Sequence, residues 1–198
     1  DEGPLYPGTC RPAPGVLASE PAALGTPDVA WRVRTDRLRD DISFSDSVQG
    51  PQQISARREI GDFVLRRRDG LFAYQLAVAV DDAQQGVTHV VRGIDLLRST
   101  FRQILLMRHL GARVPQYAHF PVVVDARGAK LSKRDAAPSI ENAPPSSVLV
   151  DALSTLMQAP PSELRRSNKK MVLSWAVEHW KLSRLAGIES IPCDPTYF

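Results

Sequence analysis

A short basic loop in the middle of the chain carries the residues best suited to chemistry. It follows the apolar stretch 120–124 after a turn at 125–128, and consists of Lys130, Leu131, Ser132, Lys133 and Arg134. Lysine presents a compact, rotatable charge, so a lysine at each end of a small loop suits a mobile clamp for a polyphosphate. Such a clamp meets the charge that develops on a leaving pyrophosphate in the transition state. A solvated turn is the alternative interpretation.

Two further side chains could hold a small acidic ligand. Arg92 ends the expected strand 88–91, and parallel sheets place ligand contacts at the ends of their strands. A guanidinium grips a carboxylate with two parallel hydrogen bonds. A surface arginine, or one paired with Asp95, is the alternative. Tyr74 offers a hydroxyl on an apolar ring, which orients a small polar substrate unless the ring packs in the core.

The remaining charged residues have a structural interpretation beside the functional one. His89, His109, His119 and His179 share no spacing and are interpreted as structural. Adjacent Asp81 and Asp82 are typical of a solvated helix end rather than of a magnesium site. Two basic clusters could follow a nucleic-acid backbone, with a solvated face as the alternative. They consist of Arg57, Arg58, Arg66, Arg67 and Arg68, and of Arg165, Arg166, Lys169 and Lys170.

Hydrophobic patterns predict the elements that position these residues. Period-2 alternation indicates strands at 29–35 and 42–48, and a third strand at 63–68, closed by the turn at 69–70, completes a small antiparallel sheet. Alternating strands and helices then predict a parallel, Rossmann-like sheet, which places the chain in the α/β class. These elements are expected at 88–91, 97–110 and 120–124. A helical region follows, with one helix from Ser146 to Pro160 and a longer one from Ser162 to near Gly187.

The composition sets loose bounds on partners and compartment. The 198 residues carry a net charge of +3 with a pI of about 9.1, which is compatible with a polyanionic partner. Cys10 and Cys193 lie near opposite ends, which indicates no disulfide framework and favours a reducing cytoplasm. No apolar run approaches the ~20 residues that cross a bilayer, so no membrane association is expected.

Five segments, in this order, resemble the second half of the catalytic domain of class I glutamyl-type aminoacyl-tRNA synthetases. They are 62–67, 69–70 with 73–77, 81–82, 86–97 and the lysine loop. In that class the loop is the KMSKS signature, here in the form KLSKR. The similarity is dense over residues 6–140, and the order of the segments makes it specific. It also favours a short helix over 71–82, where the apolar pattern alone leaves strand and helix open.

Three features resemble the short glutamyl-Q tRNA(Asp) synthetase branch of that family. Tyr6 and Cys10 are spaced like the second half of its zinc site, whose remaining ligands would precede residue 1. Residues 73–82 are similar to its glutamate-pocket segment. The chain ends at Phe198, whereas ordinary glutamyl-tRNA synthetases continue into a large anticodon-binding region.

The resemblance implies a division of the chain and a role for each candidate residue. It predicts a zinc-binding or loop remnant at 1–28 and a small antiparallel β insertion at 29–70. The second half of the catalytic domain follows at 71–143, and a helical C-terminal region at 144–198. Lys133 would be catalytic, and the whole loop 130–134 would bind ATP with Mg²⁺. Tyr74 and Arg92 would bind L-glutamate. Zn²⁺ is expected only in the full-length protein.

The implied activity is the ATP-dependent activation of L-glutamate and its transfer to the queuosine base of tRNA(Asp), by a cytoplasmic monomer. Nothing in this stretch resembles the HIGH nucleotide-binding signature of the family, so these residues alone are expected to be inactive. Two alternatives stay open. One is a truncated glutamyl-tRNA synthetase that charges tRNA(Glu), and the other is a non-catalytic RNA-binding fragment.

Overall fold

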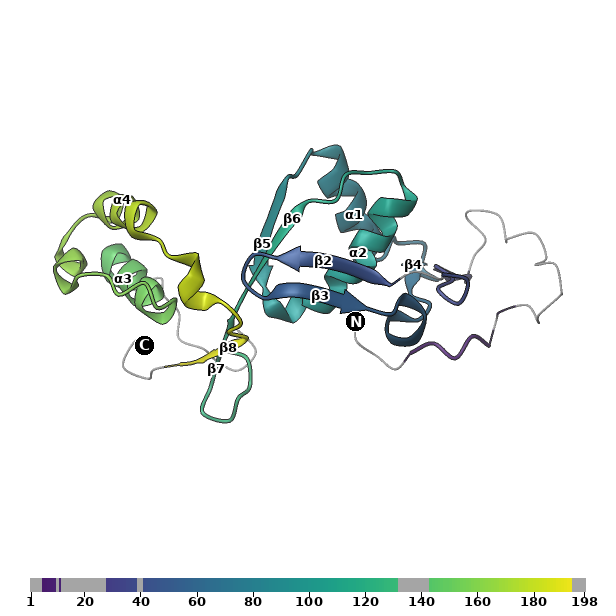
Figure 1. Cartoon of the computed structure of the whole chain (residues 1–198), viewed down its shortest axis with the longest axis horizontal. Helices are drawn as coiled ribbons and strands as arrows, with labels where there is room; N and C mark the ends of the chain where they lie inside the picture. Colours follow the sequence, from purple (N-terminus) through teal and green to yellow (C-terminus); the bar gives the residue numbers. More distant parts are fainter. Residues whose placement is uncertain (1–4, 10, 12–27, 39–40, 132–142, 194–198) are drawn as a thin grey trace. The chain divides into compact units, whose positions relative to one another are not determined.

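A computed structural model describes residues 5–9, 11, 28–38, 41–131 and 143–193 of the chain (Figure 1). These residues form two compact units that alternate along the sequence. The first unit draws on residues 1–45, 51–90 and 96–116, and the second on 46–50, 91–95 and 117–198.

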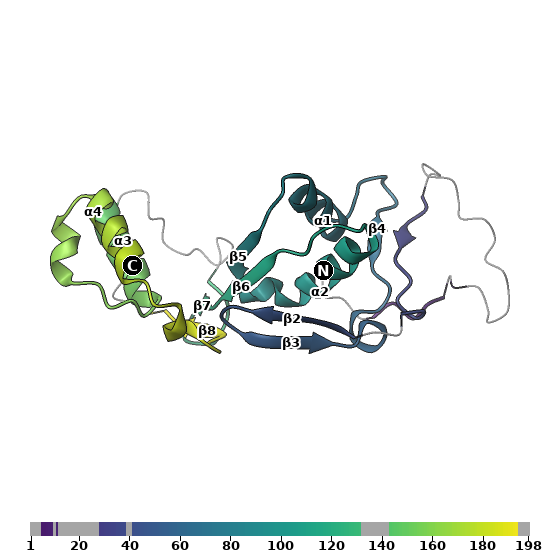
Figure 2. The same cartoon turned by 45° about the horizontal axis from the view of Figure 1, so that its top comes forward.

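A four-stranded sheet has the strand order β3-β2-β6-β5. Its strands are β2 (Ile42–Asp46), β3 (Gly50–Ile54), β5 (His89–Gly93) and β6 (Gln116–Phe120). Strands β2 and β6 are parallel, with Asp46 opposite Tyr117, whereas β2 and β3 run in opposite directions (Figure 2). The parallel pair confirms the expected α/β class. Strand β3 was not expected, because its sequence GPQQI is mostly polar.

In the first unit, helices α1 (Tyr74–Gln84) and α2 (Leu97–His109) pack against each other. Helix α2 is buried continuously over residues 99–107. Between the helices, Gln103 Nε2 donates to Gln75 Oε1 at 3.0 Å, and Gln75 Nε2 donates to Ser99 Oγ at 2.9 Å. Buried amides need such partners, so the chain of hydrogen bonds fixes how the helices pack. The helix at 97–110 was predicted from its apolar pattern, and the short helix over 71–82 from the family resemblance.

Strands β1 (Trp31–Arg32) and β4 (Val64–Arg66) form an antiparallel pair in the same unit. A π-helical turn, η1 (Ala56–Ile60), precedes β4. The expected strands at 29–35 and 63–68 are therefore present but shorter. The strand expected at 42–48 is β2, which belongs to the four-stranded sheet instead of joining this pair.

In the second unit, β7 (Val122–Val124) pairs in parallel with β8 (Ser190–Pro192). The single strand expected over 120–124 is thus wrong. Pro121 has no amide hydrogen to donate, so the ladder of β6 ends before it and β7 finds a different partner. Val48, Leu185 and Ile191 form the buried core beside these strands, with partly buried hydrophobic residues packed against it. These are Ala118, Phe120, Leu156, Trp180, Leu182 and Ile188.

Helices α3 (Pro145–Thr155) and α4 (Lys169–His179) lie side by side around Val150, Leu153 and Val172 (Figures 1 and 2). The long helix expected from residue 162 to residue 187 is wrong. It is divided into η4 (Ser162–Arg166), α4 and η5 (Leu182–Leu185).

A side-chain cap explains where the new helix begins. Asn168 Oδ1 accepts a hydrogen bond from the amide of Met171 at 3.0 Å, which is a standard way to start an α-helix. Trp180 then takes an extended conformation and ends α4. None of the helices in the described residues is long and apolar enough to cross a bilayer. The division of the chain at residues 28, 70 and 143 stays a prediction.

Candidate active site

Arg92 lies on β5, one residue before the strand ends. Its Nε donates to Nε2 of His119 at 3.2 Å, and its guanidinium carbon lies 5.7 Å from the centre of the Tyr117 ring. Two neighbouring aromatic side chains of β6 therefore hold the guanidinium. A planar cation held in this way loses less side-chain freedom when it binds a carboxylate.

His119 and Asp46 form a fully buried pair in contact with Arg92. Both side chains are 0% exposed, and His119 Nδ1 lies 2.7 Å from Asp46 Oδ2. A neutral imidazole has one N–H, and Nε2 accepts from Arg92, so the network assigns the hydrogen to Nδ1. Nδ1 then donates to Asp46. The imidazole also stacks on Tyr117, with ring centres 5.9 Å apart.

The Asp46 carboxylate holds the backbone around it as well. It accepts hydrogen bonds from the amides of Val48 and Gln49, each at 2.9 Å, and of His119 at 3.1 Å. The first two close the turn after β2, and the third comes from β6. Gln49 extends the network, because its Nε2 donates to the His119 and Ile188 carbonyls at 2.9 Å. One carboxylate thus ties the end of β2 to β6.

Hydrogen bonding and burial set the protonation of this pair. Burial alone would raise the pKa of Asp46, but the Gln49 amide, the His119 imidazole and further backbone amides outweigh it, and the pKa lies below its ordinary value. Burial lowers the pKa of His119, against the opposing hydrogen bond and charge of Asp46. At neutral pH the pair is therefore a carboxylate and a neutral imidazole, in agreement with the tautomer.

Lys130, the first lysine of the predicted ATP loop, forms an ion pair with Asp95. Its Nζ lies 2.5 Å from Asp95 Oδ2, and both side chains are about half exposed. Asp95 belongs to the 3-10 turn η2 (Ile94–Leu96) that follows β5, so the end of that strand contacts the start of the loop. The backbone of Leu131 is anchored too, because its amide donates to the Val123 carbonyl at 2.9 Å. Ser132, Lys133 and Arg134 lie outside the described residues.

Gly93 leaves the room that this ion pair needs. A Cβ at that position would lie 2.4 Å from Asp95 Oδ1. We therefore expect Gly93→Ala to displace the carboxylate from Lys130 and, because the loop is predicted to bind ATP, to raise the KM for ATP several-fold in pyrophosphate exchange by the full-length protein. The free energy of unfolding should fall by less than about 1 kcal/mol, because exposed ion pairs contribute little. Asp95→Asn removes the charge without the clash and should change KM in the same direction; an unaltered KM in both variants contradicts a role for the pair.

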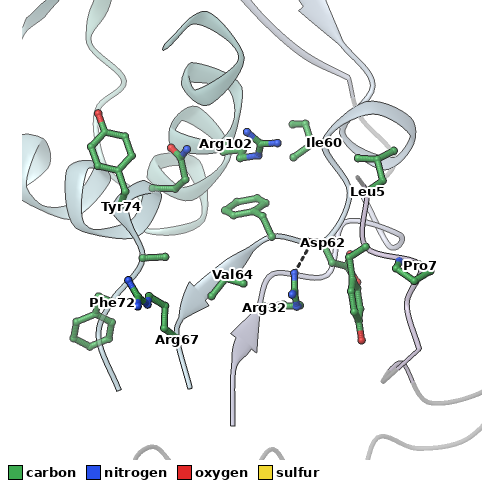
Figure 3. Close-up of a pocket in the computed structure, with 14 residues that line it drawn as sticks. Leu5, Pro7, Arg32, Ile60, Asp62, Val64, Arg67, Phe72, Tyr74 and Arg102 are labelled. Atoms are coloured by element: carbon green, nitrogen blue, oxygen red, sulfur yellow. Dashed lines mark hydrogen bonds between the residues drawn. The ribbon is translucent and has the colours of Figure 1, made fainter. Parts of the chain in front are cut away.

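Tyr74 begins α1 in the first unit and is 45% exposed, so it is not a core residue. It lines a cavity of about 620 Å³ (Figure 3). Phe72 and Arg67 lie on the same side of the cavity as Tyr74, opposite Leu5 and the segment that follows it (Figure 3). The lining therefore combines ring faces with guanidinium groups.

The opposite wall of this cavity is held by a second buried carboxylate. Asp62 accepts from Arg11 Nε at 2.6 Å and from the Thr35 amide at 2.8 Å. Arg32 Nη1 donates to the Asp62 carbonyl at 3.2 Å, and its guanidinium carbon lies 4.3 Å from the centre of the Tyr6 ring. Tyr6 is thereby fixed within the first unit.

The predicted zinc half-site is only partly described. The Tyr6 hydroxyl lies 3.1 Å from Thr9 Oγ1, and Cys10 lies outside the described residues. A cysteine sulfur is a donor that suits Zn²⁺, so the chemistry of Cys10 fits the predicted site. In the part of the chain that the structure describes, no group of three His, Cys, Asp or Glu side chains could hold a metal ion. Zinc binding stays a prediction.

Both predicted basic clusters lie at the surface. Arg67 pairs with Asp69 at 2.7 Å, and Arg165 pairs with Asp151. Several other members are exposed: Arg57, Arg58, Arg68, Arg166, Lys169 and Lys170. A nucleic-acid-binding role for either cluster stays a prediction.

The buried pair of Asp46 and His119 is the part of the site that sequence reasoning missed. The histidine was interpreted as structural, and its partner lies 73 positions away in the sequence, beyond any motif spacing. A signal was present, because the alternation that buries Ile42 and Val48 also places Asp46 on the inward face of the strand. Acidic side chains are almost never fully buried unless they are paired.

Among the predicted ligand-binding residues, the second unit contains Arg92 together with Lys130, and the first contains Tyr74. The sequence-based alternative for Arg92, a pairing with Asp95, gives way to the contact with His119, and Asp95 pairs with Lys130. The joint role of Tyr74 and Arg92 in binding glutamate stays a prediction.

The sequence of the chain matches a known protein family. The family described as tRNA synthetases class I (E and Q), catalytic domain, matches residues 24–148. Because the match covers more than half of the chain, the chain belongs to this family. Among curated relatives, it is 48% identical over 184 residues to the glutamyl-Q tRNA(Asp) synthetase of Aromatoleum aromaticum, covering 92% of this chain and 54% of that protein.

Other relatives agree. The chain is 46% identical to the glutamyl-Q tRNA(Asp) synthetase of Thiobacillus denitrificans, covering 96% of this chain and 58% of that protein. It thus spans little more than half the length of the curated relatives it matches. The fold is also that of the solved glutamate-tRNA synthetase of Elizabethkingia anophelis, at a TM-score of 0.59 and 21% identity, over 81% of this chain and 36% of that one.

Proposed function

We propose that the protein containing this chain activates L-glutamate with ATP and transfers it to the queuosine base of tRNA(Asp), as a cytoplasmic monomer. The observation that carries the proposal is the arginine at the end of β5, held by a buried neutral histidine. That group suits a carboxylate ligand, and the relatives at 46–48% identity are named glutamyl-Q tRNA(Asp) synthetases.

The activation step needs positioning and charge neutralisation more than covalent help. An oxygen of the glutamate α-carboxylate attacks the α-phosphorus of ATP, the bond to the β-phosphate oxygen breaks, and pyrophosphate leaves. In this proposal Arg92 binds a carboxylate of glutamate and Tyr74 helps to orient the substrate. Lys133 neutralises the charge that develops on the phosphates, together with the rest of the loop 130–134 and Mg²⁺.

The transfer step needs a place for an RNA base. A nucleophilic oxygen of the queuosine base attacks the activated carbonyl carbon, AMP leaves with the bonding electrons, and the proton of the hydroxyl is lost. The cavity beside Tyr74 supports this part of the proposal, because Phe72 and Tyr74 offer ring faces and Arg67 a guanidinium. Bases that are splayed out of a stack bind to such side chains.

The full-length protein tests the proposal in two assays. Pyrophosphate exchange into ATP should depend on L-glutamate and should be lost in Lys133→Ala. Labelled glutamate should then appear in tRNA(Asp) that carries queuosine, and not in the same tRNA transcribed without the modification. Transfer to the 3′ end of tRNA(Glu) would instead identify a glutamyl-tRNA synthetase. RNA binding without any exchange would identify a non-catalytic RNA-binding protein.

A further inference from the structure

We propose that Asp46 and His119 are positioning residues for Arg92, and that they fix its guanidinium for the carboxylate of an acidic amino acid. The inference rests on the proposed function for the identity of the ligand. The contacts themselves lie within the second unit: Asp46 accepts from His119 Nδ1 at 2.7 Å, and His119 Nε2 accepts from Arg92 Nε at 3.2 Å.

Burial determines which atom donates and which accepts in each contact between Asp46, His119 and Arg92. The carboxylate and the imidazole are both 0% exposed, so neither can exchange its partner for water. A carboxylate accepts only, which assigns the Nδ1 hydrogen to the shared contact and leaves the Nε2 lone pair directed at Arg92. When an arginine is held through Nε, Nη1 and Nη2 at the end of the guanidinium form one of the two edges with which this group grips a carboxylate in two parallel bonds.

The architecture alone does not require an imidazole at this position. Asp46 already accepts from the amides of Val48, Gln49 and His119, and these backbone contacts hold the turn and β6 whatever side chain residue 119 carries. An apolar ring of the same size would fill the buried space and stack on Tyr117. A neutral imidazole, unlike an apolar ring, supplies an acceptor for Arg92. The Asp46 carboxylate holds this imidazole in place.

Protonation of His119 would reverse this arrangement. Nε2 would become a donor and would face the Arg92 cation across 3.2 Å. The charged and titratable groups around the imidazole are Asp46, Asp95, Arg92 and the stacked Tyr117. Burial lowers the pKa of His119 below its ordinary 6.5, so affinity for glutamate should be constant near neutral pH and should weaken in acid, below that value.

Two substitutions of His119 in the full-length protein separate positioning from packing. His119→Gln keeps an acceptor near the place of Nε2, whereas His119→Asn keeps a donor to Asp46 and removes that acceptor. Hydrogen bonds to charged groups are the strong ones, so we expect the Asn variant to raise the KM for glutamate about 10-fold to 100-fold in pyrophosphate exchange. The Gln variant should stay within about threefold of wild type. The KM for ATP should change in neither.

The matched control is His109→Gln, an equal chemical change at an exposed histidine of α2, and it should leave both KM values unaltered. The wild-type KM for glutamate should be constant near pH 7 and should rise in acid, below pH 6.5, and the Asn variant should lack this rise. Equal KM values for glutamate in the Asn, Gln and wild-type proteins overturn the proposal.

A second measurement keeps the test decisive if a variant folds poorly. Nitrogen-15 NMR of the full-length protein labelled on histidine should show His119 neutral and protonated on Nδ1 at pH 7. An Nε2-protonated or cationic ring overturns the proposal without any variant. If the wild-type protein shows no glutamate-dependent exchange, both the proposed function and the assignment of an acidic amino acid as the ligand are wrong. The tautomer measured by NMR still decides whether Asp46 and His119 fix Arg92.

Discussion

Arg92→Ala in the full-length protein is expected to lower kcat/KM for glutamate by about 10²-fold to 10³-fold in pyrophosphate exchange, because it removes the bidentate contact with a charged ligand that the proposed function assigns to Arg92. Most of the change should lie in the KM for glutamate, since in the proposed function Arg92 would bind a carboxylate in the ground state and the transition state alike. Arg92→Lys keeps the charge but not the planar fork, and it cannot reproduce the contact from Nε to His119, so at least about a tenfold loss should remain.

Arg113→Ala is the matched control, because it removes the same side chain from an exposed position in the first unit. Its kcat and both KM values should equal those of wild type. An Arg92→Ala protein with an unaltered KM for glutamate would show that the strand-end arginine does not bind the amino acid. The KM for ATP should also be unchanged in Arg92→Ala, because a general loss of structure would raise the KM for ATP as well as the KM for glutamate.

Asp46→Ala should destabilise the protein by about 3–5 kcal/mol, because each buried donor that is left without an acceptor costs about 1–3 kcal/mol. The substitution leaves the amides of Val48, Gln49 and His119 without their acceptor in a buried site, together with the Nδ1 hydrogen of the imidazole. Urea unfolding at neutral pH measures the change. Asp41→Ala, which removes one exposed carboxylate hydrogen-bonded to Gln53, should change stability by less than about 0.5 kcal/mol.

The stability due to Asp46 should also depend on pH with a defined sign. Its pKa is lowered in the folded protein, so its contribution is fully present above the ordinary value of 3.8 and is lost as the pH falls through the folded pKa. Wild type should therefore lose stability in acid more steeply than Asp46→Ala, and the two unfolding curves should converge there. Parallel curves from pH 7 down to pH 3 would contradict this.

Local pattern was enough to predict the α/β class and the strongest elements. The apolar face of 97–110 is where periodicity placed it, because this helix buries its hydrophobic side, and the strand that contains Arg92 also lies close to its expected position. The failures have specific causes. Pro121 divides one apolar run between two sheets, and the Asn168 cap starts a helix inside a segment whose apolar spacing continues.

Only those candidate-site residues that belong to a sequence motif or lie at the end of a predicted strand could be predicted. Arg92 and Lys130 were found from the strand-end rule and the family resemblance, and the structure adds their partners. Those partners, His119 and Asp95, are 27 and 35 positions away from them, at distances that depend on how strands are ordered in space. Spacing along the chain carries no such information, which is why a buried acid on a strand was the best available sign of the network.

The pairing of β7 with β8 has a consequence for the order in which the protein is made. Val124 leads into the lysine loop, and its carbonyl accepts from the amide of Cys193 at 2.7 Å, while Val122 donates to the carbonyl of Glu189 at 3.1 Å. The base of the loop is therefore completed by residues synthesised more than sixty positions later. During translation, β7, the strand that leads into the predicted ATP loop, therefore cannot pair with β8 until α3, α4 and β8 have left the ribosome.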